Sequence, residues 1–142
     1  MSTPVTDSSN RLGWLLEDLS NVPGVRFAVL LSDDGLRIAH SDGVNKDDAE
    51  RFAAAASGLR SLGKALGEFC GGLDNGVRQN MTEYDKGMIL ITAAGEGALL
   101  GVSTTPETDI GLVAHRMNEL AGRVGHELGA QPRGRVEGGL PS

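Results

Sequence analysis

Residues 77–104 read VRQNMTEYDKGMILITAAGEGALLGVST, and this stretch determines the fold class. Two short separators, Asp85-Lys86-Gly87 and Gly95-Glu96-Gly97, divide it into three segments. Glycine tolerates the positive φ angles that tight turns need, so each separator predicts a turn between antiparallel strands. The predicted strands of this meander are Val77–Tyr84, Met88–Ala93 and Ala98–Thr104.

The segments upstream add a hairpin and a first helix. Val25–Ser32 is rich in Val, Leu and Phe, and Asp33-Asp34-Gly35 then predicts a turn into an alternating strand, Leu36–Ser41. Before this hairpin, apolar residues recur with the spacing of one helical face and end at Pro23-Gly24. The residues of this face are Leu12, Leu15, Leu16 and Leu19.

Two further helices are predicted. Asn45 is a good N-cap for a long helix that runs to about Cys70, and a final helix begins at Pro106 or Asp109 and ends at Leu128. Apolar spacing predicts one buried stripe on the long helix, made of Phe52, Ala55, Ala56, Leu59, Leu62, Leu66 and Phe69. Three glycines in this helix each cost of order 1 kcal/mol of helix propensity, which predicts that another surface packs closely against it. These glycines are Gly58, Gly63 and Gly67.

The element order is therefore α-β-β-α-β-β-β-α. One five-stranded antiparallel sheet with helices on both faces accounts for every apolar stripe, so we expect an α+β fold. The predicted domain spans residues 10–129. Residues 1–9 are expected to be a disordered leader, and residues 130–142 a disordered tail.

Composition excludes several classes of protein. Thirteen Lys and Arg against nineteen Asp and Glu give a net charge of −6 over 142 residues, without a basic cluster for nucleic acid or for an anionic membrane. No apolar run is long enough to span a bilayer, and residues 1–10 lack the apolar core of a signal peptide. A single cysteine, Cys70, fits a reducing compartment. We expect a cytoplasmic protein that reaches a membrane only through its partners.

Two nucleotide-binding strings are present, and both are rejected. Gly58–Lys64 matches the start of a phosphate loop, but it lies inside a predicted helix and is followed by Ala65 instead of Ser or Thr. Asn45-Lys46-Asp47-Asp48 matches a guanine-reading string, but it lies at a helix cap and in the reverse of the GTPase order.

The sequence offers no catalytic or ligand-binding group either. His115 and His126 lie about 16 Å apart along the last predicted helix, too far to share one metal ion. No Ser-His or Cys-His pattern stands out in the chain. We expect no catalytic residue, no metal and no cofactor, and therefore a protein that is not an enzyme.

The polar strand Val77–Tyr84 is the most informative anomaly. One interpretation is an edge strand that is kept polar against aggregation. The other is an edge that pairs with its own copy across a two-fold axis. Small residues on one face of the long helix favour the second interpretation, because they let another surface approach closely. These residues are Ala53, Ala54, Ser57, Gly58 and Ser61.

The chain resembles the Roadblock family, the dynein-light-chain-like proteins whose prokaryotic members accompany Ras-like GTPases. The resemblance spans Arg11 to Leu128, and the ordered set of strings is similar to the actinobacterial subtype. The strings are Leu12–Leu19 (LGWLLEDL), Val22–Val25 (VPGV), Ser32–Leu36 (SDDGL), Ala56–Leu59 (ASGL), Gly87–Gly95 (GMILITAAG) and Asp109–Ala114 (DIGLVA).

The resemblance implies a Roadblock/profilin-like fold and a non-enzymatic homodimer that binds a small Ras-like GTPase. Some members of the family assist GTP hydrolysis without supplying an arginine finger. Strand residues Val77, Arg78, Gln79, Asn80 and Met81 would pair across the dimer. The long-helix face would bind the GTPase through Glu50, Ala53, Ser57, Arg60, Ser61 and Lys64.

Three alternatives remain open at this point. The chain is a scaffold that docks onto a sensor-histidine-kinase-like protein without touching a GTPase, or its native partner is a paralogue instead of a second copy. A small-molecule sensor or enzyme of the profilin-like type would need a concave apolar pocket with convergent polar groups, for which the sequence offers no strong candidate.

Overall fold

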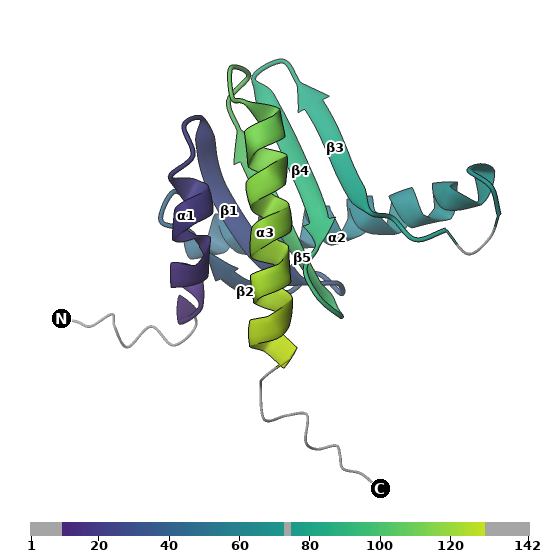
Figure 1. The fold of residues 1–142 in the computed structure, drawn as a ribbon, viewed down its shortest axis with the longest axis horizontal. Coiled ribbons are helices and arrows are strands. Elements are labelled where there is room, and N and C mark those ends of the chain that lie inside the picture. Colours follow the sequence, from purple (N-terminus) through teal and green to yellow (C-terminus); the bar gives the residue numbers. More distant parts are fainter. Residues whose placement is uncertain (1–9, 73–74, 130–142) are drawn as a thin grey trace, which may run out of the picture.

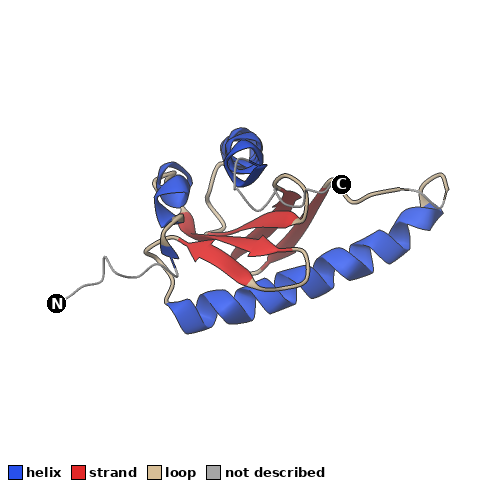
Figure 2. Cartoon of the chain, turned by 90° about the horizontal axis from the view of Figure 1, so that it is seen from below, coloured by secondary structure: helices blue, strands red, loops and turns tan. Residues whose placement is uncertain are grey.

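The computed structural model describes residues 10–72 and 75–129, which form a five-stranded antiparallel sheet between two helical layers (Figures 1 and 2). The strand order across the sheet is β2-β1-β5-β4-β3. Helix α2 (Lys46–Leu66) covers one face, and α1 (Glu17–Ser20) and α3 (Ile110–Gly129) cover the other. The strands are β1 (Val25–Ser32), β2 (Arg37–His40), β3 (Gln79–Tyr84), β4 (Gly87–Ala93) and β5 (Ala98–Thr104). The predicted fold class and element order are confirmed.

The bounds of several elements differ from the prediction: β2 is shorter than predicted, and α2 ends at Leu66 instead of about Cys70. Strand β3 begins at Gln79, so Val77 and Arg78 precede it. The first helix consists of a 3₁₀ turn, η3 (Gly13–Leu16), followed by the single α turn of α1. Gly13 lies so close to β2 that a Cβ there would be 3.1 Å from the carbonyl oxygen of His40. The predicted leader and tail, residues 1–9 and 130–142, lie outside the described residues.

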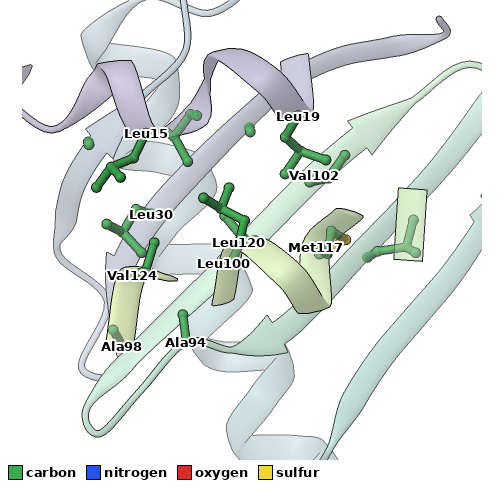
Figure 3. Packing of buried hydrophobic residues seen from close by; sticks show 14 of the residues in the cluster. Leu15, Leu19, Leu30, Ala94, Ala98, Leu100, Val102, Met117, Leu120 and Val124 are labelled. Atoms are coloured by element: carbon green, nitrogen blue, oxygen red, sulfur yellow. The ribbon is translucent and has the colours of Figure 1, made fainter. Parts of the chain in front are cut away.

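Each face of the sheet has its own hydrophobic core. Successive side chains of β1 lie on opposite faces of the sheet. Ala28 and Leu30 pack on the side of α1 and α3, and Val29 and Leu31 pack on the side of α2. The core under α1 and α3 is dense in leucine, and Figure 3 shows residues from both helices meeting those of the sheet. The core under α2 is smaller and relies on alanines of the helix. Helix α2 therefore lies close to the sheet.

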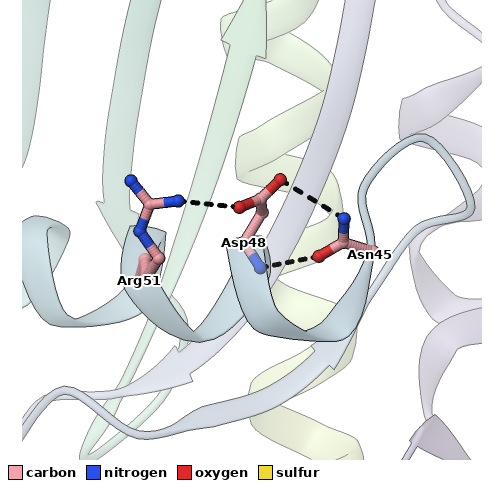
Figure 4. A network of polar contacts seen from close by, with 3 residues as sticks. All are labelled: Asn45, Asp48 and Arg51. Atoms are coloured by element: carbon pink, nitrogen blue, oxygen red, sulfur yellow. Dashed lines mark hydrogen bonds and ion pairs between the residues drawn. The ribbon is translucent and has the colours of Figure 1, made fainter.

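The start of α2 is fixed by the predicted cap. The side chain of Asn45 accepts a hydrogen bond from the backbone N–H of Asp48 at 2.8 Å (Figure 4). The carboxylate of Asp48 in turn contacts Arg51 at 2.9 Å, and both side chains are exposed. This network satisfies a free donor of the first helical turn, and its exposed ion pair adds little to stability.

The second half of α2 extends past the sheet (Figures 1 and 2). A helix of 21 residues is about 31 Å long, whereas five strands span about 19 Å. Leu62 and Leu66 are consequently 68% and 65% exposed, and Phe69, in the 3₁₀ turn η4 (Gly67–Phe69), is 76% exposed. The predicted buried stripe is therefore wrong for the single chain at these three residues, and also at Ala55, which is exposed.

None of the described helices is both long enough and apolar enough to cross a membrane.

Candidate functional site

The two edges of the sheet differ in how their backbone groups are satisfied. At the β2 edge, the side chain of Asn10 donates to the carbonyl of His40 at 3.1 Å and accepts from its backbone N–H at 2.8 Å. The amide side chain of Asn10 thus makes the two hydrogen bonds with His40 that a further strand would otherwise make. At the other edge, β3 pairs only with β4 within the described part of the sheet. Strand β3 is therefore an open edge of the described sheet, as both interpretations of its polar sequence require.

The register of β3 determines which of its side chains lie beside α2. Asn80 and Thr82 are opposite Ile91 and Ile89, which belong to the core under α2. Side chains alternate along a strand, so Met81, between Asn80 and Thr82, lies on the opposite face of the sheet, which α1 and α3 cover. Met81 is exposed on that face. An added strand at this edge would meet apolar as well as polar groups.

An apolar groove of about 700 Å³ lies between α2 and the outer strands. The middle of α2, from Phe52 to Leu62, forms one wall, and β4 with Tyr84 of β3 forms the other. Its lining residues are Phe52, Ala55, Ala56, Gly58, Leu59, Leu62, Tyr84, Ile89 and Ile91. The sequence did not predict this groove, because the spacing of the apolar flank of α2 is also that of a buried helix face.

The predicted partner-binding residues of α2 are not all accessible. Glu50, Ser61 and Lys64 are exposed, as a binding face requires. Ser57 and Arg60 are half-buried, and the Ser57 hydroxyl donates to the carbonyl of Asp33 at 2.8 Å. Ser57 therefore holds α2 to the turn between β1 and β2.

Ala53 is a correction to the predicted partner-binding set. Its exposed fraction is 0%, and it belongs to the core under α2. On a helical wheel, position 53 lies on the side that faces the sheet, and a small side chain there lets the helix approach closely. The small size of Ala53 serves internal packing, so this residue cannot contact a partner.

The predicted dimer segment lies beside the second half of α2. Arg78, Gln79 and Met81 are exposed, whereas Val77 and Asn80 are half-buried. A Cβ added at Gly63 would lie 2.9 Å from Asn80 Nδ2 and 3.5 Å from Val77 Cγ2. This glycine therefore lets the segment before β3 pack against the helix.

The other two glycines of the predicted long helix, Gly58 in α2 and Gly67 at its C-terminal cap, have different explanations. A Cβ at Gly67 would lie 2.8 Å from the carbonyl oxygen of Asn75, whose side chain donates to the carbonyl of Gly67 at 3.0 Å. The predicted close packing is thus confirmed at Gly63 and Gly67, and the packed surface is the chain itself. At Gly58 a Cβ would meet nothing within 4 Å. The cost of this glycine has no explanation within the described chain.

The two nucleotide-like strings lie where the sequence analysis expects them. Gly58–Lys64 is interior to α2, whose backbone N–H groups are engaged in the helix, and Asn45–Asp48 forms its N-terminal cap. Within residues 10–72 and 75–129, no three His, Cys, Asp or Glu side chains gather closely enough to hold a metal ion. The described surface around β3 and α2 presents the outer edge of β3, the apolar groove and exposed charges of both signs.

Comparisons with known proteins identify the family of the chain. The model of the Roadblock/LC7 domain matches residues 12–104. An uncharacterized protein of Methanocaldococcus jannaschii, MJ0714, is 31% identical over 110 residues, covering 78% of this chain and 90% of that protein. The chain belongs to the Roadblock/LC7 family.

Solved structures show the same fold. A Roadblock/LC7 domain from Streptomyces avermitilis has 37% identity and a TM-score of 0.76, covering 82% of this chain and 96% of that one. This match is consistent with the actinobacterial subtype. MglB of Myxococcus xanthus has 17% identity and a TM-score of 0.76, covering 88% and 100% of the two chains. At that identity the likeness concerns the fold alone.

Proposed function

We propose that this protein is a homodimeric, non-catalytic regulator of a small Ras-like GTPase. The dimer forms through the β3 edge and the apolar groove beside α2, and the outer face of α2 binds the GTPase. The working unit is residues 10–129. The protein acts in the cytoplasm and reaches a membrane only when its partners recruit it. Membership of the Roadblock/LC7 family supports this role, because the family resemblance implies GTPase-associated signalling modules.

Two features that lie side by side support the proposed dimer. Strand β3 is the open edge, and the apolar groove with Leu62 and Tyr84 lies next to it. A two-fold axis perpendicular to the sheet joins two β3 strands in antiparallel fashion and keeps both α2 helices on the same face. Each α2 then lies over the other copy's outer strands. One contact thereby buries the exposed flank of α2 and satisfies the edge of β3.

The observation that carries the GTPase platform is the outer face of α2. Glu50, Ser61 and Lys64 are exposed there. They offer a partner one small polar side chain and charges of both signs. Gly58 lines the apolar groove of the proposed dimer contact, so it is not assigned to this face. In the dimer two such faces lie on one side of the joined sheet, and together they form a broad platform.

Regulation by such a platform is differential binding. A surface that binds the GTP-bound conformation more tightly shifts the nucleotide states by the ratio of the two affinities and by no more. A tenfold preference corresponds to about 1.4 kcal/mol, which is within reach of a few exposed contacts. The GTPase supplies the nucleotide site and its chemistry, and this protein supplies only the surface.

The test is GTP turnover by a Ras-like GTPase of the same organism, measured as phosphate release with and without this protein. The proposal expects a saturable change in the rate. Ser61→Arg places a bulky charge on the platform and should abolish the change. Asn118→Arg, an equally exposed site on α3 across the sheet, should leave it intact. A rate that does not change at saturating protein, together with binding to a sensor-kinase-like protein, would favour the scaffold alternative.

A further inference from the structure

A second groove lies on the opposite side of the sheet, between η3 and α3. Its volume is about 480 Å³, and its walls include Trp14 and Leu15 of η3 and Gly122 and His126 of α3. Trp14 is the single tryptophan of the chain and is 58% exposed. An indole placed at the mouth of a groove can be covered by an apolar or cationic group.

Gly122 gives this groove its depth. It lies in the interior of α3, where glycine costs about 1 kcal/mol relative to alanine. A Cβ at this position would meet nothing within 4 Å, so packing within the described chain does not explain the glycine. A side chain there would instead fill the groove beside Trp14. The glycine keeps the groove open for an occupant.

Acidic side chains border the groove. Glu119 and Glu127 of α3 both line it, and its one arginine, Arg123, lies 3.7 Å from the carboxylate of Asp18. Glu119 also contacts His115 at 3.5 Å. Because Asp18 compensates the charge of Arg123, the carboxylates of Glu119 and Glu127 leave the groove with a negative border. The groove therefore favours an occupant that carries positive charge.

We propose that residues 131–136 of the same chain, Gln-Pro-Arg-Gly-Arg-Val, dock in this groove with Arg133 and Arg135 at its acidic border and over Trp14. The described chain ends at Gly129, two residues beyond Glu127. Arg133 lies four residues past Gly129, a reach of up to about 13 Å, and Arg135 six residues past it, up to about 20 Å. Glu119 is about 15 Å back along α3. The segment is therefore long enough to cover the groove.

The short connection favours this occupant over one from solution. A tether of a few residues gives an effective concentration in the millimolar range, so even a weak contact with Trp14 and the two glutamates is substantially populated. The docking site lies on the face of the sheet opposite α2. This inference is therefore independent of the proposed GTPase platform.

The experiment uses the full chain, isotopically labelled and carrying a spin label at Val136→Cys in a Cys70→Ser background; Cys70 is exposed. The single Trp14 gives one indole N–H signal, which the label broadens when it lies nearby. We expect the signal to lose roughly half its intensity or more relative to the reduced label, as a millimolar effective concentration implies. Full intensity in the labelled chain would overturn the proposal.

Three groove variants and one control show whether the groove is responsible. Arg133→Ala with Arg135→Ala, and separately Glu119→Gln with Glu127→Gln, should restore the signal. The control, Glu107→Gln, changes an exposed acid in the loop before α3 and should not restore it. Gly122→Gln places a side chain in the groove at a position where a Cβ meets nothing within 4 Å, and it raises helix propensity, so it should restore the signal in a protein that remains folded. Broadening that persists in all three groove variants contradicts docking in the groove.

A mixed sample separates this chain from a second copy. Isotopically labelled chain without the spin label is combined with spin-labelled chain without isotope. The proposal expects full Trp14 intensity in this mixture, because the contact is within one chain. Broadening in the mixture would show that the segment binds another copy and would overturn the intramolecular contact.

Discussion

Leu62→Ala tests the proposed dimer at the side chain that lies in the groove beside α2. Leu62 is 68% exposed in the single chain, so most of its surface remains available for burial by a partner. The substitution removes three carbons, worth about 2.4 kcal/mol when fully buried. Scaled by the exposed fraction, this is about 1.6 kcal/mol per copy, and about 3 kcal/mol for the two copies of a symmetric interface. The dimer dissociation constant should rise roughly two hundredfold.

Sedimentation velocity over a range of concentrations measures this dissociation constant. The matched control is Leu36→Ala, because Leu36 is 66% exposed but lies in the turn between β1 and β2, at the other end of the sheet. The control should change the constant by no more than about twofold, the usual range for an unpartnered surface residue. Circular dichroism should show both variants folded. Equal constants for Leu62→Ala and the native chain would refute the placement of the interface.

Three substitutions test the account of the helix and turn, each by urea unfolding at a fixed protein concentration. Asn45→Ala removes the bond to the backbone N–H of Asp48 and should lower the free energy of unfolding by about 1 kcal/mol; no loss would contradict the cap. Gly95→Ala should cost about 1–3 kcal/mol from its φ of +81° alone, and more because the new Cβ would lie 2.7 Å from Gly125 Cα; a neutral result would contradict this contact. Gly58→Ala should stabilise the fold by up to about 1 kcal/mol, since its Cβ meets open space, and a loss would mean that an unrecognised contact needs the glycine.

The strands and the start of α2 follow directly from local sequence signals. Alternation and the turn glycines place β5 at Ala98–Thr104, as predicted, and the cap at Asn45 sets the first turn of α2. These signals depend on neighbouring residues only, so a single sequence contains them. Strand β3 is less well defined because polar residues occupy both of its faces, and its start is two residues later than predicted.

Periodicity could not show how much of α2 is covered. The spacing of Leu62, Leu66 and Phe69 predicts that they share one side of a long helix, but coverage depends on the width of the sheet beneath that helix. That width is set by long-range pairing of strands. The same limit applies to Ala53, whose small side chain fits either close internal packing or an accessible face. The sequence therefore predicted the elements of the candidate site better than its boundary with the core.

Calorimetric titration of this protein with the Ras-like GTPase, loaded either with GDP or with a non-hydrolysable GTP analogue, tests the central proposal most directly. The account predicts saturable binding with different affinities in the two states, and loss of that binding in Ser61→Arg while the protein remains dimeric by sedimentation. Absence of binding in both nucleotide states, or binding that Ser61→Arg leaves unchanged, would contradict a GTPase platform on the outer face of α2.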